Sequence, residues 1–233
     1  WGCSGIITGP CKPSEATLIA HARVPVVVFE PSPEMRKPPH PLANRSCLLF
    51  DSRAVGKTAA DYFLMRRYAH FAYVGDTHNL YWSQERQAGF CETTKSAGAT
   101  CSVYGTLSPK ERLDWAAEQP RMGAWLQALP KPVALFAAMD GRARQVLDAC
   151  MAAGIAVPDD VAVLGVDDDS FICEATFPTL SSIQTNGQQA GFLLAEHLDA
   201  LMRGRRPATR VIRVLPNRVV TRTSTDIVAV PDS

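Results

Sequence analysis

The hydrophobic pattern alternates between short apolar runs and segments in which apolar residues recur every three or four positions. Runs of strand length cover 4–9, 24–30, 47–51, 70–76, 100–105, 132–140 and 161–169. Helical spacing covers 14–23, 53–67, 82–98, 113–130, 141–154 and 187–204. Strands that alternate with helices of this length predict an α/β fold, built of parallel β/α/β units with helices on both faces of each sheet.

The order of elements changes after Pro178. Residues 180–186 are extended, and 209–222 alternate apolar and basic residues, which predicts a two-strand ribbon at a sheet edge. We expect two α/β lobes, with one crossing between Asp51 and His70 and another near 180–187. The predicted boundaries are 1–69 with 186–204 for the N-terminal lobe, 70–185 with 205–222 for the C-terminal lobe, and 223–233 for a linker.

Composition excludes several classes of function. The 24 basic residues nearly balance 23 acidic ones, so we do not expect this segment to bind DNA by itself. No apolar run is long enough to span a bilayer. The seven cysteines form no CxxC and mostly lie in apolar surroundings, which favours buried free thiols in a reducing compartment, hence a cytoplasmic protein.

The familiar enzymatic motifs are missing from the sequence. VGKTAAD (55–61) resembles a phosphate loop, but Asp51 occupies the position where that loop needs its first glycine. There is no GxSxG, no GxGxxG, and no HxxxH or HExxH pair among the five histidines. We therefore predict no catalytic residues, no cofactor, no metal site and no enzyme activity.

Acidic residues recur where predicted strands end, at Asp51, Asp76, Asp140 and Asp167. Ligands of open parallel sheets bind outside the carboxyl ends of the strands, and a carboxylate there can accept hydrogen bonds from two neighbouring hydroxyls. Trp82 offers a flat face for a sugar ring, and Arg86, one helical turn further on, offers a planar donor. These residues favour a sugar site, although some of the acids could instead cap the helices that follow them.

Several motifs carry a family resemblance that covers nearly the whole chain in the same order. They are GIITGP (5–10), FDSRAVGKTAADYFL (50–64), ERQAGF (85–90), the block from Ala134 to Asp169 with GIAVPDDVAVLGVDD at its centre, and PTLSSIQTNGQQAGFLLAEHLDALMRG (178–204). Together they resemble the effector-binding core of the lac repressor family, which is related to type I periplasmic sugar-binding proteins. The block around GVDD is specific, whereas ERxxGF alone would be weak.

A closer resemblance is to the sugar-sensing half of AraC-family xylose operon activators, carried by MGAWLQALPKP, DGRARQVLDAC and RVVTRTSTD. It implies a two-lobed type I periplasmic-binding-protein-like fold, each lobe a parallel sheet flanked by helices. The start of the chain lacks the family's first strand–helix–strand, so we expect an incomplete N-terminal lobe. In that group an AraC-type DNA-binding domain follows RTSTD, which here would lie outside the chain.

The resemblance implies a sugar site in the cleft between the lobes, formed by Trp82, Glu85, Arg86, Asp140, Asp167 and Asn186. Asp167 would hold sugar hydroxyls, while Asp168 and Asp169 would bind loop amides or face water. Where relatives often have a glutamine that reaches the sugar, this chain has Thr185, and Gln184 or Asn186 could substitute. Arg86 could anchor its own helix as well as contact the ligand.

The resulting hypothesis is a ligand-sensing domain that binds a monosaccharide, xylose or another pentose, and controls DNA binding through the absent domain. The expected assembly is a homodimer without a membrane segment. A periplasmic sugar receptor of a transporter is the alternative, and an enzyme on a doubly wound fold is a third possibility. Unpaired cysteines and the RTSTD segment argue against the receptor, and the lack of GxGxxG argues against a dinucleotide enzyme.

Overall fold

The structure, a computed structural model, describes residues 2–205 and 207–227 and divides them into two compact units. Unit 1 contains the described residues up to Asp51 and Asn186–Leu215. Unit 2 contains Ser52–Thr185 and the described residues from Pro216 onward. Each unit has its own sheet and its own hydrophobic clusters, so each is described by itself.

Unit 1 is built on a parallel sheet of four strands in the order β1-β2-β3-β9. The strands are β1 (Ile6–Thr8), β2 (Val26–Phe29), β3 (Ser46–Phe50) and β9 (Val211–Val214), and the helices are α1 (Pro13–His21) and α8 (Gly187–Met202). Val26 and Val28 pack in one cluster with Ala16 of α1, whereas Val27 packs in another with Leu194 of α8. The period of two along β2 therefore buries both faces of the sheet.

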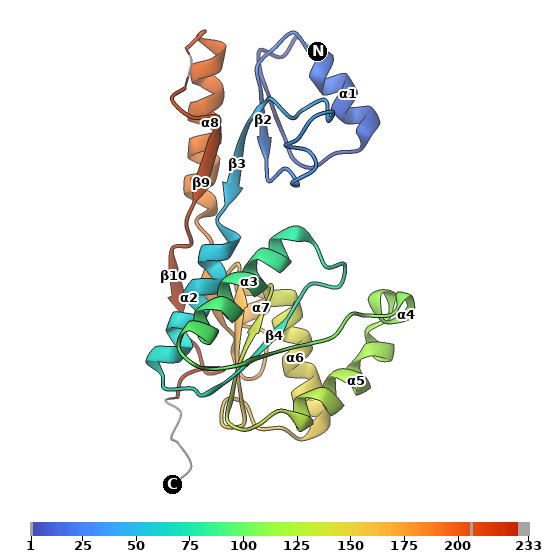
Figure 1. Cartoon of the computed structure of the whole chain (residues 1–233), viewed down its shortest axis with the longest axis vertical. Coiled ribbons are helices and arrows are strands. Elements are labelled where there is room, and N and C mark those ends of the chain that lie inside the picture. The colour runs from blue at the N-terminus through green and yellow to red at the C-terminus, as the bar shows by residue number, and fades with distance from the viewer. Residues whose placement is uncertain (1, 206, 228–233) are drawn as a thin grey trace. The chain divides into compact units, whose positions relative to one another are not determined.

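Unit 2 is built on a six-stranded sheet in the order β10-β8-β7-β6-β4-β5, parallel except for β10. Its strands are β4 (His70–Val74), β5 (Cys101–Val103), β6 (Val133–Ala137), β7 (Val161–Val166), β8 (Ser181–Gln184) and β10 (Arg218–Val220). Its helices are α2 (Ser52–Met65), α3 (Tyr81–Ser96), α4 (Pro109–Leu113), α5 (Trp115–Ala128), α6 (Asp140–Ala153) and α7 (Ser170–Cys173). In Figure 1, α2 lies beside α3 and α5 lies beside α6.

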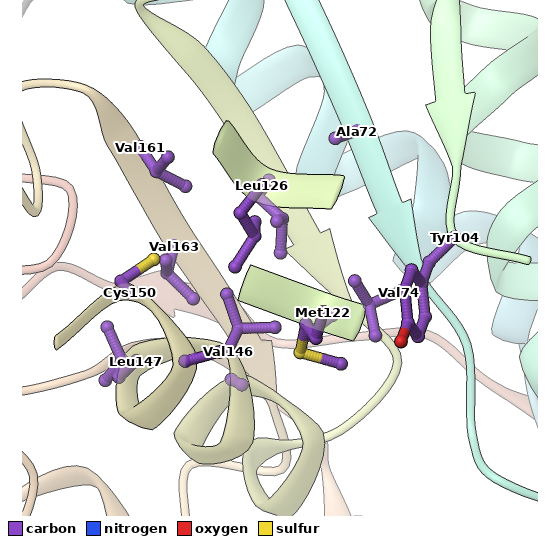
Figure 2. Packing of buried hydrophobic residues seen from close by; sticks show 14 of the residues in the cluster. Ala72, Val74, Tyr104, Met122, Leu126, Val146, Leu147, Cys150, Val161 and Val163 are labelled. Atoms are coloured by element: carbon purple, nitrogen blue, oxygen red, sulfur yellow. The ribbon is translucent and has the colours of Figure 1, made fainter. Parts of the chain in front are cut away.

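Each face of the unit 2 sheet has its own apolar core. Figure 2 shows the core beneath α5 and α6, where Met122 and Leu126 meet Val146 and the strand residue Val163. The core on the other face is aromatic: Phe63 of α2 and Phe90 of α3 belong to one cluster with Tyr73 and Phe136. The predicted α/β fold with parallel sheets flanked by helices is confirmed.

Two glycines let α2 and α3 approach each other closely. A Cβ atom on Gly56 would lie 2.0 Å from the carbonyl oxygen of Arg86, and one on Gly89 would lie 2.1 Å from that of Arg53. Neither backbone oxygen can move aside, so both positions require glycine. Gly56 of VGKTAAD and Gly89 of ERQAGF thus serve helix packing, and Lys57 pairs with Asp61 on the surface.

The boundaries between the units differ from the predicted ones. Helix α2 belongs to unit 2, although residues 52–69 are predicted to belong to the N-terminal lobe. Strand β9 belongs to unit 1, although residues 205–222 are predicted to belong to the C-terminal lobe. The predicted ribbon over 209–222 is wrong: β9 pairs in parallel with β3, and β10 pairs antiparallel with β8. An alternating pattern predicts a strand but not its partner.

The predicted linker also begins too early. Ser224 and Thr225 are fully buried in unit 2. The Ser224 hydroxyl donates to the carbonyl oxygen of Val163 at 2.7 Å, and the Thr225 hydroxyl lies 2.7 Å from the oxygens of Tyr62 and Ser181. These hydrogen bonds replace water and allow a polar segment to be buried. Of the predicted linker, 228–233 lie outside the described residues.

The cysteines and the helix over 113–130 show smaller differences. All seven cysteines are free, but only Cys47, Cys150 and Cys173 are buried; Cys3 is exposed.

The single helix predicted over 113–130 is divided at Asp114, which caps α5 by accepting a hydrogen bond from the Ala116 amide. Pro120 lies inside α5 without ending it.

Candidate sugar site

The candidate site in unit 2 lies where the parallel strands β4, β6 and β7 end. Their carboxyl ends share one edge of the sheet, because neighbouring strands run in the same direction. The segments that follow these strands carry Trp82 and Arg86 in the first half of α3, Asp140 at the start of α6, and Asp167 in the loop after β7. The fold therefore brings side chains to one edge that are far apart in the sequence.

Arg86 links the loops after all three strands. Its side chain is almost entirely buried, although arginine is rarely so, and its Nη1 donates to the carbonyl oxygen of Ala138. Its Nη2 lies 3.9 Å from Oδ1 of Asp167, and its guanidinium lies 4.8 Å from the centre of the Trp82 ring. Trp82, Arg86 and Asp167 thus form one cluster, in which a cation lies against both an aromatic face and a carboxylate.

Asp167 has an unusual backbone and an accessible side chain. Its φ is 108°, a region that favours glycine, and its side chain is 46% exposed. Partial withdrawal from water raises the pKa of Asp167, Arg86 opposes this effect, and Asp169 adds to it. Strained backbone at an exposed carboxylate is typical of functional positions, because the surrounding structure must stabilise it.

The two acids after Asp167 serve the loop. Asp169 caps α7 by accepting a hydrogen bond from the Phe171 amide at 3.0 Å, which confirms the expectation of a loop amide. Asp168 binds side chains instead of a backbone amide or water. Its Oδ1 accepts a hydrogen bond from Nη2 of Arg222 at 2.9 Å, and its Oδ2 accepts one from the side chain of Gln184. Asp168 is therefore a largely buried anchoring carboxylate, whereas Asp167 and Asp169 are both exposed and Asp169 also caps α7.

Asp140, the first residue of α6, is only 2% exposed and holds the loop after β7. Its Oδ1 accepts a hydrogen bond from the Ser182 hydroxyl at 2.6 Å, and its Oδ2 accepts from the Asp169 amide at 2.9 Å and the Cys173 thiol at 3.4 Å. Burial raises the pKa of Asp140 to about 6, although the hydrogen bonds oppose this shift. The carboxyl group thus holds the segment that follows Asp167.

The other two predicted residues, Glu85 and Asn186, have polar neighbours of their own. Glu85 is exposed on α3, with its Oε2 3.8 Å from Nη1 of Arg53. Asn186 belongs to unit 1 and precedes α8, where its side-chain amide donates to Gln189 at 2.6 Å. The structure therefore brings together Trp82, Arg86, Asp140 and Asp167 among the predicted residues.

The loop after β4 is fixed by residues that the prediction did not include. The hydroxyls of Tyr73 and Ser83 lie 2.9 Å apart, and the Asp76 amide donates to the Ser83 hydroxyl at 3.0 Å. The Asp76 carboxylate accepts from the amides of His78 and Leu80, each at 2.7 Å. The sequence predicts Asp76 as an acid at a strand end, but it does not predict the contact between Ser83 and Tyr73.

A cavity of about 290 Å³ lies beside this loop, and a buried ion pair forms part of its wall. Arg142 lines the cavity and binds Glu118 through two hydrogen bonds, at 3.0 and 2.7 Å. Its Nε donates to the carbonyl oxygen of Gly75 at 3.0 Å. Because Glu118 neutralises Arg142, the guanidinium orients the loop rather than attracting an anion. The two residues are far apart in sequence, so no local signal predicts the pair.

The described residues contain neither a metal-binding group nor a membrane-spanning helix. No group of three or more His, Cys, Asp or Glu side chains there could hold a metal ion. Among the same residues, no helix is both long and apolar enough to cross a membrane.

The fold and the site define the class of protein: an α/β binding module with parallel sheets and polar side chains at the carboxyl ends of the strands. The sequence profile of the periplasmic binding protein-like domain family matches residues 60–225. The chain belongs to this family.

The relatives found by sequence are regulators. A xylose operon regulatory protein of Haemophilus influenzae is 28% identical over 233 residues, covering 98% of this chain and 58% of that protein. One of Escherichia coli K12 is 30% identical over 164 residues, covering 70% of this chain and 42% of that protein. The chain thus spans about half the length of the curated relatives it matches.

Solved structures agree with the fold. A xylose-binding transcription activator superposes with a TM-score of 0.84 at 26% identity, covering 98% of this chain and 60% of that one. A transcriptional regulator in complex with cellobiose has a TM-score of 0.72 at 21% identity, covering 96% of this chain and 66% of that one, and supports the fold alone. The predicted resemblance to lac repressor-like effector domains is therefore confirmed.

Proposed function

We propose that this chain is the sugar-sensing domain of a bacterial transcription regulator, and that its ligand is a monosaccharide, xylose or another pentose. The observation that carries the proposal is the cluster of Trp82, Arg86 and Asp167 at the carboxyl ends of the strands. It combines an aromatic surface, a charged donor and an accessible carboxylate, which are the groups that a small polyol needs. The matches to xylose regulators support the choice of a pentose.

Each residue of the cluster has a distinct proposed role. Asp167 accepts hydrogen bonds from two neighbouring sugar hydroxyls, and its partly exposed side chain leaves room for them. Arg86 donates to a sugar oxygen with the N–H groups that face the edge, while Ala138 fixes its orientation. Trp82 packs against the C–H groups of the ring.

The remaining predicted residues have supporting roles. Asp140 is a positioning residue, since its oxygens accept hydrogen bonds from the loop that carries Asp167. Glu85 and Asn186 are proposed as further polar contacts, because Glu85 is exposed and Asn186 is partly exposed.

Sensing requires no chemical step. A sugar that binds one conformation more tightly than another shifts the population toward it, and the shift cannot exceed the difference in binding free energy. We propose that the response reaches an AraC-type DNA-binding domain outside this chain, in a cytoplasmic homodimer. The names of the relatives, all of them regulators of transcription, support recognition rather than turnover.

Thermal unfolding of the chain with a panel of aldopentoses and aldohexoses tests the proposal. A sugar at 100 times its dissociation constant should add about 2.7 kcal/mol to the free energy of unfolding. We expect D-xylose or another pentose to give the largest shift, and the sugar to be recovered unchanged after incubation. If no aldose raised the unfolding temperature, the proposed sugar site would be rejected. If the sugar were converted to another compound, the proposed sensor function would be rejected.

A further inference from the structure

Unit 1 contains two adjoining cavities on the side of its sheet where β2, β3 and β9 begin. One has a volume of about 260 Å³ and the other of about 450 Å³, and Arg45 and Arg210 line both. The smaller cavity, here called the arginine pocket, is lined by Val28, Pro31, Met35, Arg36, Leu42, Ala43, Arg45, Cys47, Arg210 and Val211. Every one of these residues belongs to unit 1.

The residues that line the arginine pocket include positively charged side chains and no acidic ones. It is lined by Arg36, Arg45 and Arg210 but by no aspartate or glutamate. Among the ion pairs of the described residues, none includes these three arginines. The Cys47 thiol adds no negative charge at neutral pH, because burial raises its pKa. Three arginines therefore line one small cavity.

The donors of these side chains are only partly used. Arg45 donates from Nη2 to the carbonyl oxygen of Ala20 at 2.9 Å, and Arg210 donates from Nη1 to that of Asn44 at 3.5 Å. The Nε of Arg36 is buried and has no hydrogen-bond partner in the described structure. An unsatisfied buried N–H costs about 1–3 kcal/mol, which a bound acceptor would recover.

The chemistry of the pocket indicates the kind of acceptor. The planar guanidinium fork matches the spacing of oxygens in phosphate and carboxylate groups, and several arginines together favour an anion over a neutral ligand. Val28, Met35 and Leu42 provide an apolar wall for a short carbon skeleton. The volume of the cavity suits a small metabolite of a few carbon atoms rather than a nucleotide.

We propose that the arginine pocket binds a small organic anion with a phosphate or carboxylate group, as a second ligand site separate from the sugar site. Phosphate and carboxylate share this recognition chemistry, so the probes must distinguish them. The site lies in unit 1 and shares no residue with the Trp82–Arg86–Asp167 cluster of unit 2.

Isothermal titration calorimetry on the intact chain at low ionic strength tests the proposal with 3-phosphoglycerate, inorganic phosphate, lactate and neutral glycerol. We expect saturable binding of at least one anion and none of glycerol. Arg36→Met should weaken binding at least about tenfold, because it removes a charged donor. Lys37→Met, which removes an equal charge from an exposed neighbour that does not line the pocket, should leave binding unchanged.

Two further measurements show whether Arg36→Met is correctly folded. The unfolding temperature of ligand-free Arg36→Met should equal or exceed that of the unmodified chain, because the substitution removes an unpaired buried N–H. The response to sugar should persist in this variant. The proposal is wrong if no anion binds up to about 10 mM, which would exclude any dissociation constant in the millimolar range or below. Equal weakening by Arg36→Met and Lys37→Met would likewise overturn it, since it would indicate a general attraction to positive charge.

Discussion

The arginines that line cavities or strand ends in the two units differ in their partners. In unit 2 three partly or fully buried arginines each lie against an acid: Arg86 with Asp167, Arg142 with Glu118, and Arg222 with Asp168. In unit 1 the arginines of the arginine pocket have no acidic partner among the described residues. The paired charges fix the loops at the carboxyl ends of the strands, whereas the unpaired ones leave donors for a ligand.

The largest effect is expected where a buried charge loses its partner. Glu118→Gln leaves Arg142 buried without a compensating charge and should lower the free energy of unfolding by about 3–5 kcal/mol. Arg36→Met, by contrast, should change it by no more than about 0.5 kcal/mol or increase it. Urea unfolding of both variants measures the difference.

A double variant checks the cause. Glu118→Leu combined with Arg142→Leu removes both charges and should recover part of the loss. Should Glu118→Gln lose less than about 1 kcal/mol, the contrast between paired and unpaired arginines would have no energetic basis.

The second effect is a dependence of stability on pH at Asp140. Its pKa is raised to about 6 in the folded state from an ordinary value of 3.8, so the folded state binds the proton more tightly. Stability from this group is therefore present below pH 4 and decreases as the pH rises to about 6, by about 2–3 kcal/mol. Urea unfolding between pH 4 and 7 should show this decrease in the unmodified chain, and Asp140→Asn should remove it. If Asp140→Asn had the same pH profile as the unmodified chain, a group other than Asp140 would cause the pH dependence.

A third effect tests the buried hydroxyls after β10. Thr225→Val removes a buried hydroxyl that pairs with both Tyr62 and Ser181 and should cost about 1–2 kcal/mol. Thr223→Val, whose hydroxyl bonds Thr179 at the surface, is the matched control and should change little. Equal thermal shifts for the two variants would show that the segment behaves as a linker after all.

The smallest effect is expected at Asp167. Asp167→Gly should change the free energy of unfolding by no more than about 1 kcal/mol, because glycine adopts the φ of 108° without strain, which offsets the loss of the ion pair with Arg86 at 3.9 Å. The same change removes the proposed sugar acceptor, so binding should be lost while stability is nearly retained. A loss of more than about 2 kcal/mol would mean that the Asp167 carboxylate serves the fold rather than the ligand.

Periodicity was sufficient for the sheets and helices, because burial imposes a period of two or 3.6 on each element. Periodicity failed where the role of a segment depends on a partner that is distant in the sequence. The alternation in 209–222 is genuine, but β9 and β10 pair in different sheets. The polar RTSTD looks like a linker because the sequence does not reveal that its hydroxyls pair with β8 and α2.

The candidate site shows the same limit. Strand-end position predicted both Asp140 and Asp167, yet only the three-dimensional structure shows that the first is buried by three donors and the second is accessible. The Arg142–Glu118 pair and the arginine pocket depend on residues from different elements, so no local spacing could indicate them.

The measurement that tests the central proposal most directly is isothermal titration calorimetry of D-xylose, or of the pentose selected by thermal unfolding, against Asp167→Ala and Asp169→Ala. If Asp167 accepts two sugar hydroxyls, Asp167→Ala should weaken binding by about 100-fold or more. Asp169→Ala, which loses only the cap of α7, should stay within about tenfold of the unmodified chain. Equal losses in both variants, or full binding by Asp167→Ala, would contradict the proposed site.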